Sequence, residues 1–437
     1  MPSFASLIES KLSAETVEVL KTAGELAVSG DHGASDAYLV GGSVRDLVLG
    51  RSPKDPDITV VGKGGRFARS LAEAVKGTIV SVSQFGTAII DTPLGHIDVT
   101  TARSETYSQP AALPDIRPAA IEQDLQRRDF SVNAMAVSLV PQKWGTLLDP
   151  FHGFADAARK RLRILHDKSF QDDPTRILRA VRYAVRLGFS FEVATAEALE
   201  RDMSYIDTLS SARLLAEIEK ILLEPTRADI LRRAEELGII GAISPSLRVT
   251  ETGLKAMEQF GASKTPVDEL LYVACMASSM TEEEATAVIE RLHPDKDWQA
   301  VMHGAATFRD VASLLESPDL LPSEVVELLE RVPAPVLEFQ RIAGPKTRQR
   351  EHIEAYLRRH RNIRAEITGD VLAEQGVPRG PLMGKLLLEL RVARLDGKVA
   401  SRDQELELVR RRLPILLSRE ASESDNGNQR PTGAAVP

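Results

Sequence analysis

The chain contains a single cysteine, Cys275, among its 437 residues. One cysteine excludes a disulfide framework and a zinc site built from cysteines. Because Cys275 lies in the apolar run LLYVACMA, we expect it to be part of the core. Long apolar runs are missing too: none approaches the roughly 18 residues of a membrane-spanning helix, and no signal-peptide pattern opens the chain. We therefore expect a cytoplasmic protein.

The chain also lacks an overall positive charge. Its 63 Asp and Glu residues outnumber 55 Lys and Arg residues, which gives a formal net charge of −8. This balance excludes a protein that is basic all over, but two segments are locally basic. Residues 159–186 contain nine Lys/Arg and three Asp/Glu, and residues 341–364 contain eight Lys/Arg and two Glu. Such segments either follow a phosphate backbone or form solvated helix faces.

The expected elements divide the chain into a mixed α/β part and a longer helical part. A content of 43% hydrophobic and 27% charged residues is typical of a globular protein, and 437 residues suffice for two to four domains. Strand and helix patterns alternate at first, and helical patterns then dominate. We predict helices at 1–36, an α/β head with a mixed sheet at 37–150, helical segments at 151–225, 226–355 and 356–418, and a disordered end at 419–437.

One stretch of the head has little periodicity. Residues 104–121, SETYSQPAALPDIRPAAI, contain three prolines. This pattern predicts a long mobile loop. Loops of this length inside compact domains are usually functional.

The segment YLVGGSVRDLVLGRSPKDPDITVVG, residues 38–62, is the most informative part of the chain. An expected strand leads through Gly41 and Gly42 into a helix that opens at Val44 and Arg45. Glycines let backbone N–H groups approach a phosphate closely, and the helix N-terminus adds a favourable dipole. Arg45 adds a fixed positive charge. The turn therefore predicts a phosphate-binding site, although such turns are also common in ordinary loops.

Acidic residues follow at the start of the next expected strand. Asp55 and Asp57 share a face, because alternate residues of a strand point the same way. Adjacent carboxylates repel each other unless a cation lies between them, and Mg²⁺ prefers oxygen ligands. Asp98, in HIDVTTAR, would add a third carboxylate from a neighbouring strand and complete a two-metal site. The alternative is that these residues are solvated at the surface.

Residues 122–136, EQDLQRRDFSVNAMA, combine further polar side chains. Arg128 offers bidentate binding of a triphosphate. Asp129 and Asn133 suit the hydroxyl groups of a ribose. The alternative is a helix N-terminal turn held by structural salt bridges.

Residues 171–189, QDDPTRILRAVRYAVRLGF, predict a helix that begins at Pro174 and ends at Gly188. Asp173, Arg176, Arg179 and Arg182 recur every three residues and therefore drift slowly around one side of it. A solvated arginine ridge is the alternative, with Asp173 as the N-cap before proline.

These segments occur in an order that resembles a known family. GGSVRD, KDPD, RRDFSVNAMA, DPFHG, DDPTRILRAVR and SARLLAEIEKIL resemble motifs of the class II CCA-adding tRNA nucleotidyltransferases and bacterial poly(A) polymerases. The match covers about residues 37–225, and residues 367–387 resemble the tail segment of members that act on tRNA. The resemblance implies a polymerase β-like nucleotidyltransferase head at 37–150. It also implies a base-recognising neck at 151–225, a body at 226–355 and a tRNA-binding tail at 356–418.

The resemblance implies roles in the head. Asp55 and Asp57 match the metal-binding pair and Asp98 matches the third carboxylate, so the expected cofactor is Mg²⁺ in a two-metal site. Contacts to the nucleotide are expected from Gly42, Arg45, Arg128, Asp129 and Asn133.

The resemblance implies further roles in the neck. Asp173 and Arg176 match the pair that reads the incoming base, and Arg179 and Arg182 continue the same helix. Arg213 and Glu217 match a neck motif that braces this helix. Asp172 is a departure, because the family usually has Glu at this position.

The implied reaction is the addition of CCA, or part of it, to the 3′ end of tRNA from CTP and ATP without a template. The 3′-hydroxyl attacks the α-phosphate in line, and pyrophosphate leaves. Asp173 would accept a hydrogen bond from the exocyclic amine of cytosine or adenine while Arg176 donates to the ring nitrogen. Uracil and guanine present the opposite polarity. Neither a membrane nor a stable protein partner is implied.

Other activities remain open within and outside the family. CC-adding and A-adding enzymes share these motifs. Poly(A) polymerases tend to carry a basic, histidine-containing stretch where this chain has VSVSQFGTAIIDT, residues 80–92, which favours tRNA as the substrate. An RNA-binding protein without catalysis would have lost at least one of the three carboxylates, and all three are present.

Overall fold

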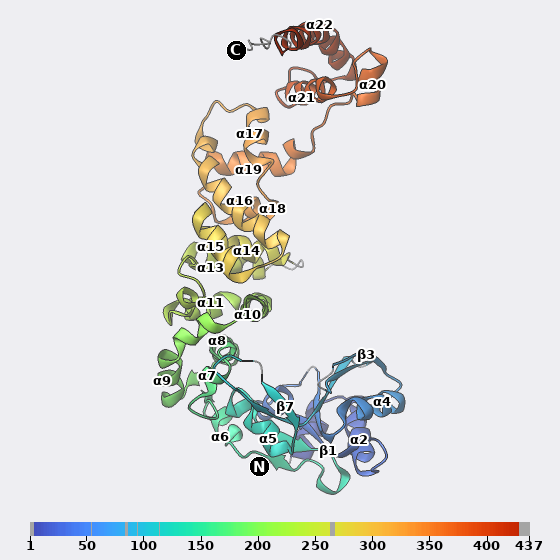
Figure 1. Cartoon of the computed structure of the whole chain (residues 1–437), viewed down its shortest axis with the longest axis vertical. Helices are drawn as coiled ribbons and strands as arrows, with labels where there is room; N and C mark the ends of the chain where they lie inside the picture. Colours follow the sequence, from blue (N-terminus) through green and yellow to red (C-terminus); the bar gives the residue numbers. More distant parts are fainter. Residues whose placement is uncertain are drawn as a thin grey trace, which may run out of the picture. The chain divides into compact units, whose positions relative to one another are not determined.

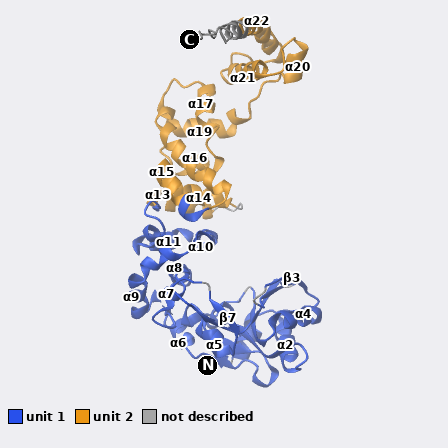
Figure 2. Cartoon of the chain, in the orientation of Figure 1, with its two compact units in different colours: residues 1–249, 290–293 blue, residues 250–289, 294–437 orange. Residues whose placement is uncertain are grey.

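The computed structural model describes residues 4–427 except 54, 84–85, 94, 113 and 263–266. Contacts divide the chain into two compact units (Figure 2). Unit 1 contains residues 1–249 and 290–293, and unit 2 contains residues 250–289 and 294–437. The chain therefore enters unit 2, returns briefly to unit 1 and re-enters unit 2.

Unit 1 contains a mixed sheet with the strand order β3-β4-β5-β2-β1-β8-β9 (Figure 1). Strands β2 and β5 are parallel, and the other neighbouring pairs are antiparallel. The strands are β1 (Ala34–Val40), β2 (Asp57–Gly62), β3 (Thr78–Val82), β4 (Ala88–Thr92), β5 (Gly95–Thr101), β8 (Ala136–Ser138) and β9 (Leu147–Leu148). The expectation of an α/β head with a mixed sheet is confirmed.

Alternating strand residues bury both faces of this sheet. On one face, Leu39 and Ile58 belong to a large core that also contains Leu20 and Phe67. These two come from α2 (Ala14–Val28) and α4 (Gly64–Ala74), and α1 (Phe4–Lys11) packs into the same core. On the other face, Val40 packs with α5 (Ile121–Gln126). Since adjacent residues of β1 point to opposite faces, the strand is covered on both sides.

The parallel pair β2–β5 sets the position of two acidic residues. Ile58 and Val60 of β2 are fully buried, which fixes the face that this strand presents to the core. Asp57, the first residue of β2, lies opposite Asp98 of β5 in the strand register. The two carboxylates predicted to lie on neighbouring strands are therefore brought side by side.

The expectation of a long loop at 104–121 is wrong for part of this stretch. Strands β6 (Arg103–Thr106) and β7 (Asp115–Pro118) form an antiparallel pair in which Glu105 lies opposite Ile116. The prolines hid this hairpin, because Pro118 occupies the last position of β7, where a missing N–H donor is tolerated. The described residues of the connection between the two strands, and residues 119–120 after β7, form neither helix nor strand.

The rest of unit 1 is mainly helical. Helix α8 (Thr175–Leu187) begins after Pro174 and ends at Gly188, which has φ +69°, as the sequence pattern predicts. The other elements are α3 (Gly42–Val48), α6 (Gly153–Ala158), β10 (Arg161–Leu162), α7 (Ser169–Asp172), β11 (Ser190–Phe191), α9 (Val193–Arg201), α10 (Ser211–Leu223), α11 (Arg227–Glu236) and α12 (Ile239–Ile243).

Unit 2 is helical. Its helices are α13 (Glu251–Gly261), α14 (Glu269–Ala277), α15 (Glu282–Leu292, whose last residues return to unit 1), α16 (Lys296–Ala312), α17 (Pro322–Leu329), α18 (Ala334–Ala343), α19 (Arg348–Arg358), α20 (Gly369–Glu374), α21 (Pro381–Leu395) and α22 (Arg402–Gly427). Cys275 is fully buried in α14, which confirms its expected core position. Within the described residues, no helix is long and apolar enough to cross a membrane.

The segment 419–437, for which the sequence predicts disorder, begins as a helix. Helix α22 continues to Gly427. Arg, Glu and Ala in the sequence SREASE favour a helix once the preceding turns have formed, because extending a helix costs far less than nucleating one. Residues 428–437 lie outside the described part of the chain.

Candidate active site

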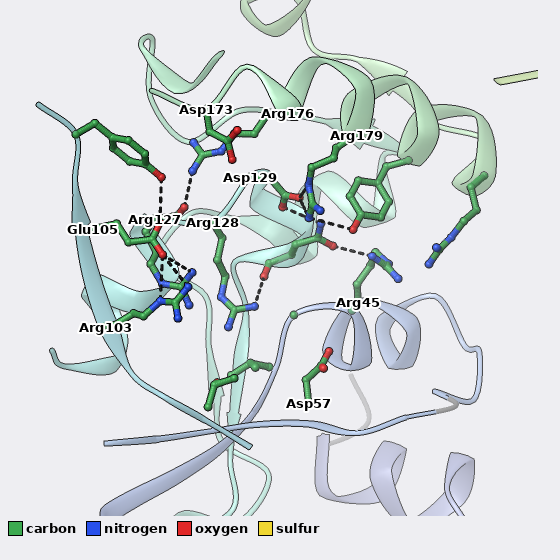
Figure 3. Close-up of a pocket in the computed structure, with 18 residues that line it drawn as sticks. Arg45, Asp57, Arg103, Glu105, Arg127, Arg128, Asp129, Asp173, Arg176 and Arg179 are labelled. Carbon is green, nitrogen blue, oxygen red and sulfur yellow. Dashed lines mark hydrogen bonds and ion pairs between the residues drawn. The ribbon is translucent and has the colours of Figure 1, made fainter. Parts of the chain in front are cut away.

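A cavity of about 510 Å³ in unit 1 collects residues from three of the predicted motifs (Figure 3). The β1–α3 turn and β2 supply Gly41, Gly42, Arg45 and Asp57; the segment after α5 supplies Arg127, Arg128, Asp129 and Asn133; α8 and the residue before Pro174 supply Asp173, Arg176 and Arg179. In Figure 3, Asp57 lies on one side of the cavity, the Asp173–Arg176 pair on the other, and Arg45 and Arg128 between them. Distant sequence motifs therefore form one site.

The β1–α3 turn brings backbone close to an arginine. Gly41 has φ +64°, and a Cβ atom there would lie 2.6 Å from Nη1 of Arg128. Glycine is required both for the left-handed backbone and for this close approach. Arg45 is almost fully buried on the first turns of α3, where Asp46 binds its guanidinium and Asn133 Oδ1 accepts a hydrogen bond from Nη1 at 2.7 Å.

Three carboxylates influence one another at the floor of the site. Burial, reinforced by the charge of Asp98 and Asp55, raises the pKa of Asp57 to about 6. Burial and Asp55 also raise the pKa of Asp98. Asp55 is exposed in the bend before β2, and of the three carboxylates only Asp57 lines the cavity. The structure therefore brings the three predicted carboxylates into one electrostatic cluster, led by the Asp57–Asp98 pair.

These residues fit a hard divalent cation. Asp57 and Asp98 supply oxygen ligands, and the pKa of Asp57 is raised by burial and then by the neighbouring carboxylates, both of which a bound cation would offset. In the part of the chain that the structure describes, no three acidic, His or Cys side chains converge closely enough to hold a metal alone. A Mg²⁺ ion at this site would therefore complete its shell with water and substrate phosphate oxygens, as is usual for this ion.

A buried aspartate orients two arginines of the RRD segment. Asp124 is fully buried; its Oδ1 accepts hydrogen bonds from Arg127 and its Oδ2 from Arg128. Burial opposes the charge of Asp124, but Arg128 and Arg127 outweigh it and lower its pKa. Arg128 thus lines the cavity from a fixed position, where a triphosphate can meet it.

Asn133 and Asp129 form a chain of hydrogen bonds between Arg45 and Arg179. Asn133 accepts from Arg45 and donates through Nδ2 to Asp129 Oδ1 at 2.9 Å. Asp129 Oδ2 accepts two hydrogen bonds from Arg179, at 2.6 and 3.0 Å. Burial opposes the charge of Asp129, but Arg179 and Asn133 outweigh it, and the pKa of Asp129 is lowered. Both residues line the cavity, and each already has protein partners.

Asp173 and Arg176 lie together at the start of α8. Asp173 Oδ1 accepts hydrogen bonds from Thr175 and, at 2.6 Å, from Arg213 Nη2. Arg176 is buried, with Nη1 donating to Ser169 and Nη2 to the carbonyl oxygen of Arg127. Local contacts therefore hold both side chains at the cavity wall.

Arg182 does not line the cavity, unlike the other arginines of this series. Its guanidinium forms ion pairs with Glu217 of α10 and with Glu224. Glu217 also pairs with Arg179 and Lys220. Arg182 thus joins α8 to α10, and the position of Glu217 agrees with the bracing role that the family resemblance implies.

Further residues of the lining were not expected from the motifs. Three of them lie at alternate positions in and just after β6: Arg103, Glu105 and Tyr107. This alternation is typical of a strand, but the neighbouring prolines obscure it in the sequence. Glu105 accepts hydrogen bonds from Arg103, Arg127 and the Tyr107 hydroxyl. Burial and Glu105 raise the pKa of Tyr107. Tyr183 and Arg186 of α8, Val40 of β1 and Thr100 of β5 complete the lining.

Family models match two parts of the chain. Residues 37–163 match the poly(A) polymerase head domain, and residues 188–250 match a probable RNA-binding site of poly(A) polymerase. The three motifs that line the cavity lie within or next to these two segments.

Curated relatives cover most of the chain. The chain is 32% identical to an A-adding tRNA nucleotidyltransferase of Geobacter sulfurreducens. The match covers 92% of this chain but only 48% of that protein. An A-adding tRNA nucleotidyltransferase of Halalkalibacterium halodurans is 30% identical, and the match covers 92% of this chain and 94% of that protein. A CC-adding enzyme of Deinococcus radiodurans is 32% identical over 86% of this chain and 89% of its own length.

Solved structures of CCA-adding enzymes have the same fold. An apo form matches with a TM-score of 0.78 at 28% identity, over 93% of this chain and 98% of its own. A Thermotoga maritima CCA-adding enzyme in complex with tRNA matches with a TM-score of 0.71 at 27% identity, over 94% and 99% of the two chains.

Proposed function

The chain belongs to the family of tRNA nucleotidyltransferases and bacterial poly(A) polymerases, and we propose that it adds nucleotides of the CCA end to tRNA without a template. Its substrates would be CTP, ATP and the 3′ end of tRNA. The relatives named above add A, CC or CCA. A cytoplasmic location is part of this proposal, because its substrates are found there.

One observation carries the proposal. A single cavity is lined by a half-buried carboxylate (Asp57), by arginines from three segments (Arg45, Arg128 and Arg179) and by a carboxylate–guanidinium pair (Asp173 and Arg176). These three groups suit, in turn, a metal ion, a polyanion and the polar edge of a base. A nucleoside triphosphate needs all three in one place.

Two sides of the cavity would divide the chemistry. Asp57 and Asp98, with Asp55 nearby, would hold Mg²⁺, which when bound neutralises phosphate charge and favours attack of the primer hydroxyl on the α-phosphate. Arg45 and Arg128 would orient the triphosphate so that pyrophosphate leaves in line. Because Asp124 and Asn133 hold these arginines in place beforehand, little reorganisation is needed on binding.

Base selection would rest on hydrogen-bond polarity. Asp173 would accept from the exocyclic amine of cytosine or adenine, and Arg176 would donate to the adjacent ring nitrogen. Uracil and guanine offer a carbonyl and a ring N–H in the same places, so two desolvated polar groups would be unpaired. At about 1–3 kcal/mol each, this gives roughly 30- to 10⁴-fold rejection. One pair of side chains would thus serve both CTP and ATP.

Addition of A alone is the second candidate function. The A-adding relatives from Geobacter and Halalkalibacterium each match 92% of the chain, at 32% and 30% identity. Residues of the catalytic motifs do not separate the two, because both enzymes use the same reaction.

The decisive experiment supplies purified protein with tRNAs that end before CCA, after the first C and after CC, together with CTP, ATP or both. Addition of CCA to the shortest tRNA would support the full activity, and extension of only the CC-ending tRNA with ATP would support A addition. Long A tails would instead identify a poly(A) polymerase. If none of the tRNAs is extended in the presence of Mg²⁺, the proposal is wrong.

A further inference from the structure

Tyr183 lines the cavity, yet neither the motifs nor the proposed chemistry uses it. It lies on α8, and its ring packs edge to face on Phe130, with centroids 6.0 Å apart and planes at 82°. Phe130 is fully buried. The core therefore supports the ring from one side while its surroundings on the cavity side are polar.

Four guanidinium groups surround the Tyr183 ring. The distances from the guanidinium carbon to the ring centroid are 5.0 Å for Arg182, 5.5 Å for Arg179, 5.6 Å for Arg45 and 5.6 Å for Arg186. Cations within about 6 Å of an aromatic face are attracted by its quadrupole. Arg45 belongs to α3, whereas the other three belong to α8. The ring therefore links the phosphate-binding turn to α8.

Tyr183 also closes a ring of contacts. Arg45 donates to Asn133, Asn133 donates to Asp129, and Asp129 accepts from Arg179. Arg179 and Arg45 then meet again at Tyr183, whose hydroxyl oxygen lies 3.4 Å from Nη2 of Arg179. Each of these two arginines is thus held from both sides.

An aromatic ring suits this position because it holds cations without adding negative charge. The acidic partners Asp46, Asp129, Glu217 and Glu224 already balance the four arginines. A further carboxylate would repel an incoming triphosphate, whereas the neutral ring attracts the guanidinium groups and leaves the field at the cavity unchanged.

We propose that Tyr183 is a positioning residue that holds Arg45 and Arg179 in the orientation in which Arg45 binds the triphosphate of the nucleotide. It deepens the proposed function and rests on it. Tyr183 touches no reacting atom; it acts through the two arginines. Its loss should therefore weaken triphosphate binding and leave the choice of base unchanged, because Asp173 and Arg176 are held by other contacts.

The test compares Tyr183→Phe, which keeps the ring, with Tyr183→Leu and Tyr183→Met, which remove it. Binding of inorganic triphosphate to the full chain is measured by calorimetry without tRNA, and KM and kcat are measured for CTP and ATP. We expect Tyr183→Phe to keep the triphosphate affinity and both KM values within about twofold of the original protein. Tyr183→Leu and Tyr183→Met should weaken triphosphate binding and raise both KM values by roughly 3- to 30-fold, with kcat and the CTP/UTP preference nearly unchanged.

Tyr205→Leu is the matched control, since Tyr205 lies in the same unit and outside the cavity lining. Wild-type triphosphate affinity in both folded ring-deletion variants would overturn the proposal, as would an equal loss in Tyr183→Phe. Unfolding temperatures identify a variant that fails to fold, and the second ring deletion then decides. If triphosphate binding follows the ring while no tRNA is extended, the inference holds and the proposed function fails.

Discussion

The Asp57 carboxylate is half-buried at the start of β2 beside Asp98, and its pKa is raised to about 6 because desolvation and the neighbouring carboxylates disfavour its charge. At neutral pH the Asp57 carboxylate of the metal-free folded protein is therefore ionised, although its surroundings disfavour the charge. The unfolded chain releases this proton near the ordinary value of 3.8. Folding stability thus falls as the pH rises from about 4 to about 6, and the cost is fully present above 6.

We expect Asp57→Asn to stabilise the metal-free protein and to abolish nucleotide addition. The amide has the size of the carboxylate but carries no charge, so the repulsion is removed. The gain should be on the order of 1–3 kcal/mol at pH 8 and should vanish near pH 4. Urea unfolding in EDTA at both pH values measures the gain, and CTP incorporation with Mg²⁺ measures the activity. A variant less stable than the original protein at pH 8 would contradict the repulsion.

At the scale of elements, Arg213 joins α10 to two parts of the site. Its Nη2 donates to Asp173 at 2.6 Å and its Nη1 donates to the carbonyl oxygen of Ala111 at 3.2 Å. Ala111 lies in the connection between β6 and β7, and its N–H donates to the carbonyl oxygen of Gln171 beside α8. The hairpin connection, α10 and the start of α8 therefore share one set of hydrogen bonds around Asp173.

Removing this arginine should loosen base selection. In Arg213→Met, Asp173 keeps its bonds to Thr175 but loses its charged partner, so its carboxylate samples more orientations. We expect the CTP/UTP ratio of kcat/KM to fall by up to about tenfold, or about 1.4 kcal/mol, which is slightly less than the 1.5–3 kcal/mol of a charge-assisted hydrogen bond. Competition between the two nucleotides on one tRNA measures it. Arg201→Met is the control, because its partners Asp167 and Asp202 do not line the cavity. Equal CTP/UTP ratios in the original protein and both variants would refute a role of Arg213 in base selection.

The sequence predicts best those strands and helices whose apolar residues recur at a regular spacing. The strand at Asp57–Gly62 and the helix from Thr175 to Leu187 follow this rule, and Pro174 and Gly188 mark the ends of the helix. The β6–β7 hairpin was missed because Pro118 ends one strand and the chain between the strands hides the alternation. Local pattern is a weak guide where pairing with a distant segment decides the structure.

The site divides in the same way. The spacing around Asp57 predicts a metal site, and the family resemblance implies a role for Arg176 in base recognition; both residues line the cavity. Arg182 has the same spacing, yet it pairs with Glu217 and Glu224, whose positions depend on where α10 packs. Tyr183 has no signal of its own in the sequence, because its surroundings come from α3, α8 and the segment after α5. Contacts between elements are therefore what the sequence alone cannot supply.

At the scale of the whole molecule, one arginine secures the short return of the chain to unit 1. Arg291 belongs to residues 290–293, which lie in unit 1 although the preceding residues belong to unit 2. Its guanidinium donates to the carbonyl oxygens of Ile206, Leu209 and Ile243, at 3.1–3.2 Å. Ile206 lies within a short 3-10 helix at Met203–Thr208, Leu209 follows that helix, and Ile243 is the last residue of α12. The last carbonyl groups of a helix have no partner within the helix, so they are available to Arg291.

The two tryptophans allow the two units to be followed separately. Trp144 lies in unit 1 and Trp298 in unit 2, and the chain has no other tryptophan. Trp298→Phe therefore leaves a fluorescence signal from unit 1, and Trp144→Phe leaves one from unit 2. Because two compact units need not unfold together, each signal is expected to have its own midpoint.

We expect Arg291→Ala to lower the unfolding midpoint of unit 1 specifically. Three carbonyl groups lose a charged donor, which costs about 2–4 kcal/mol. For a unit of this size that corresponds to roughly 5–15 °C in the Trp298→Phe background. Arg309→Ala is the control, because Arg309 donates to the Ser279 carbonyl oxygen within unit 2 and is exposed; it should leave the Trp144 signal unchanged. If Arg291→Ala shifts the Trp144 and Trp298 signals equally, the return segment stabilises the whole chain, and the division into two units does not describe how it unfolds.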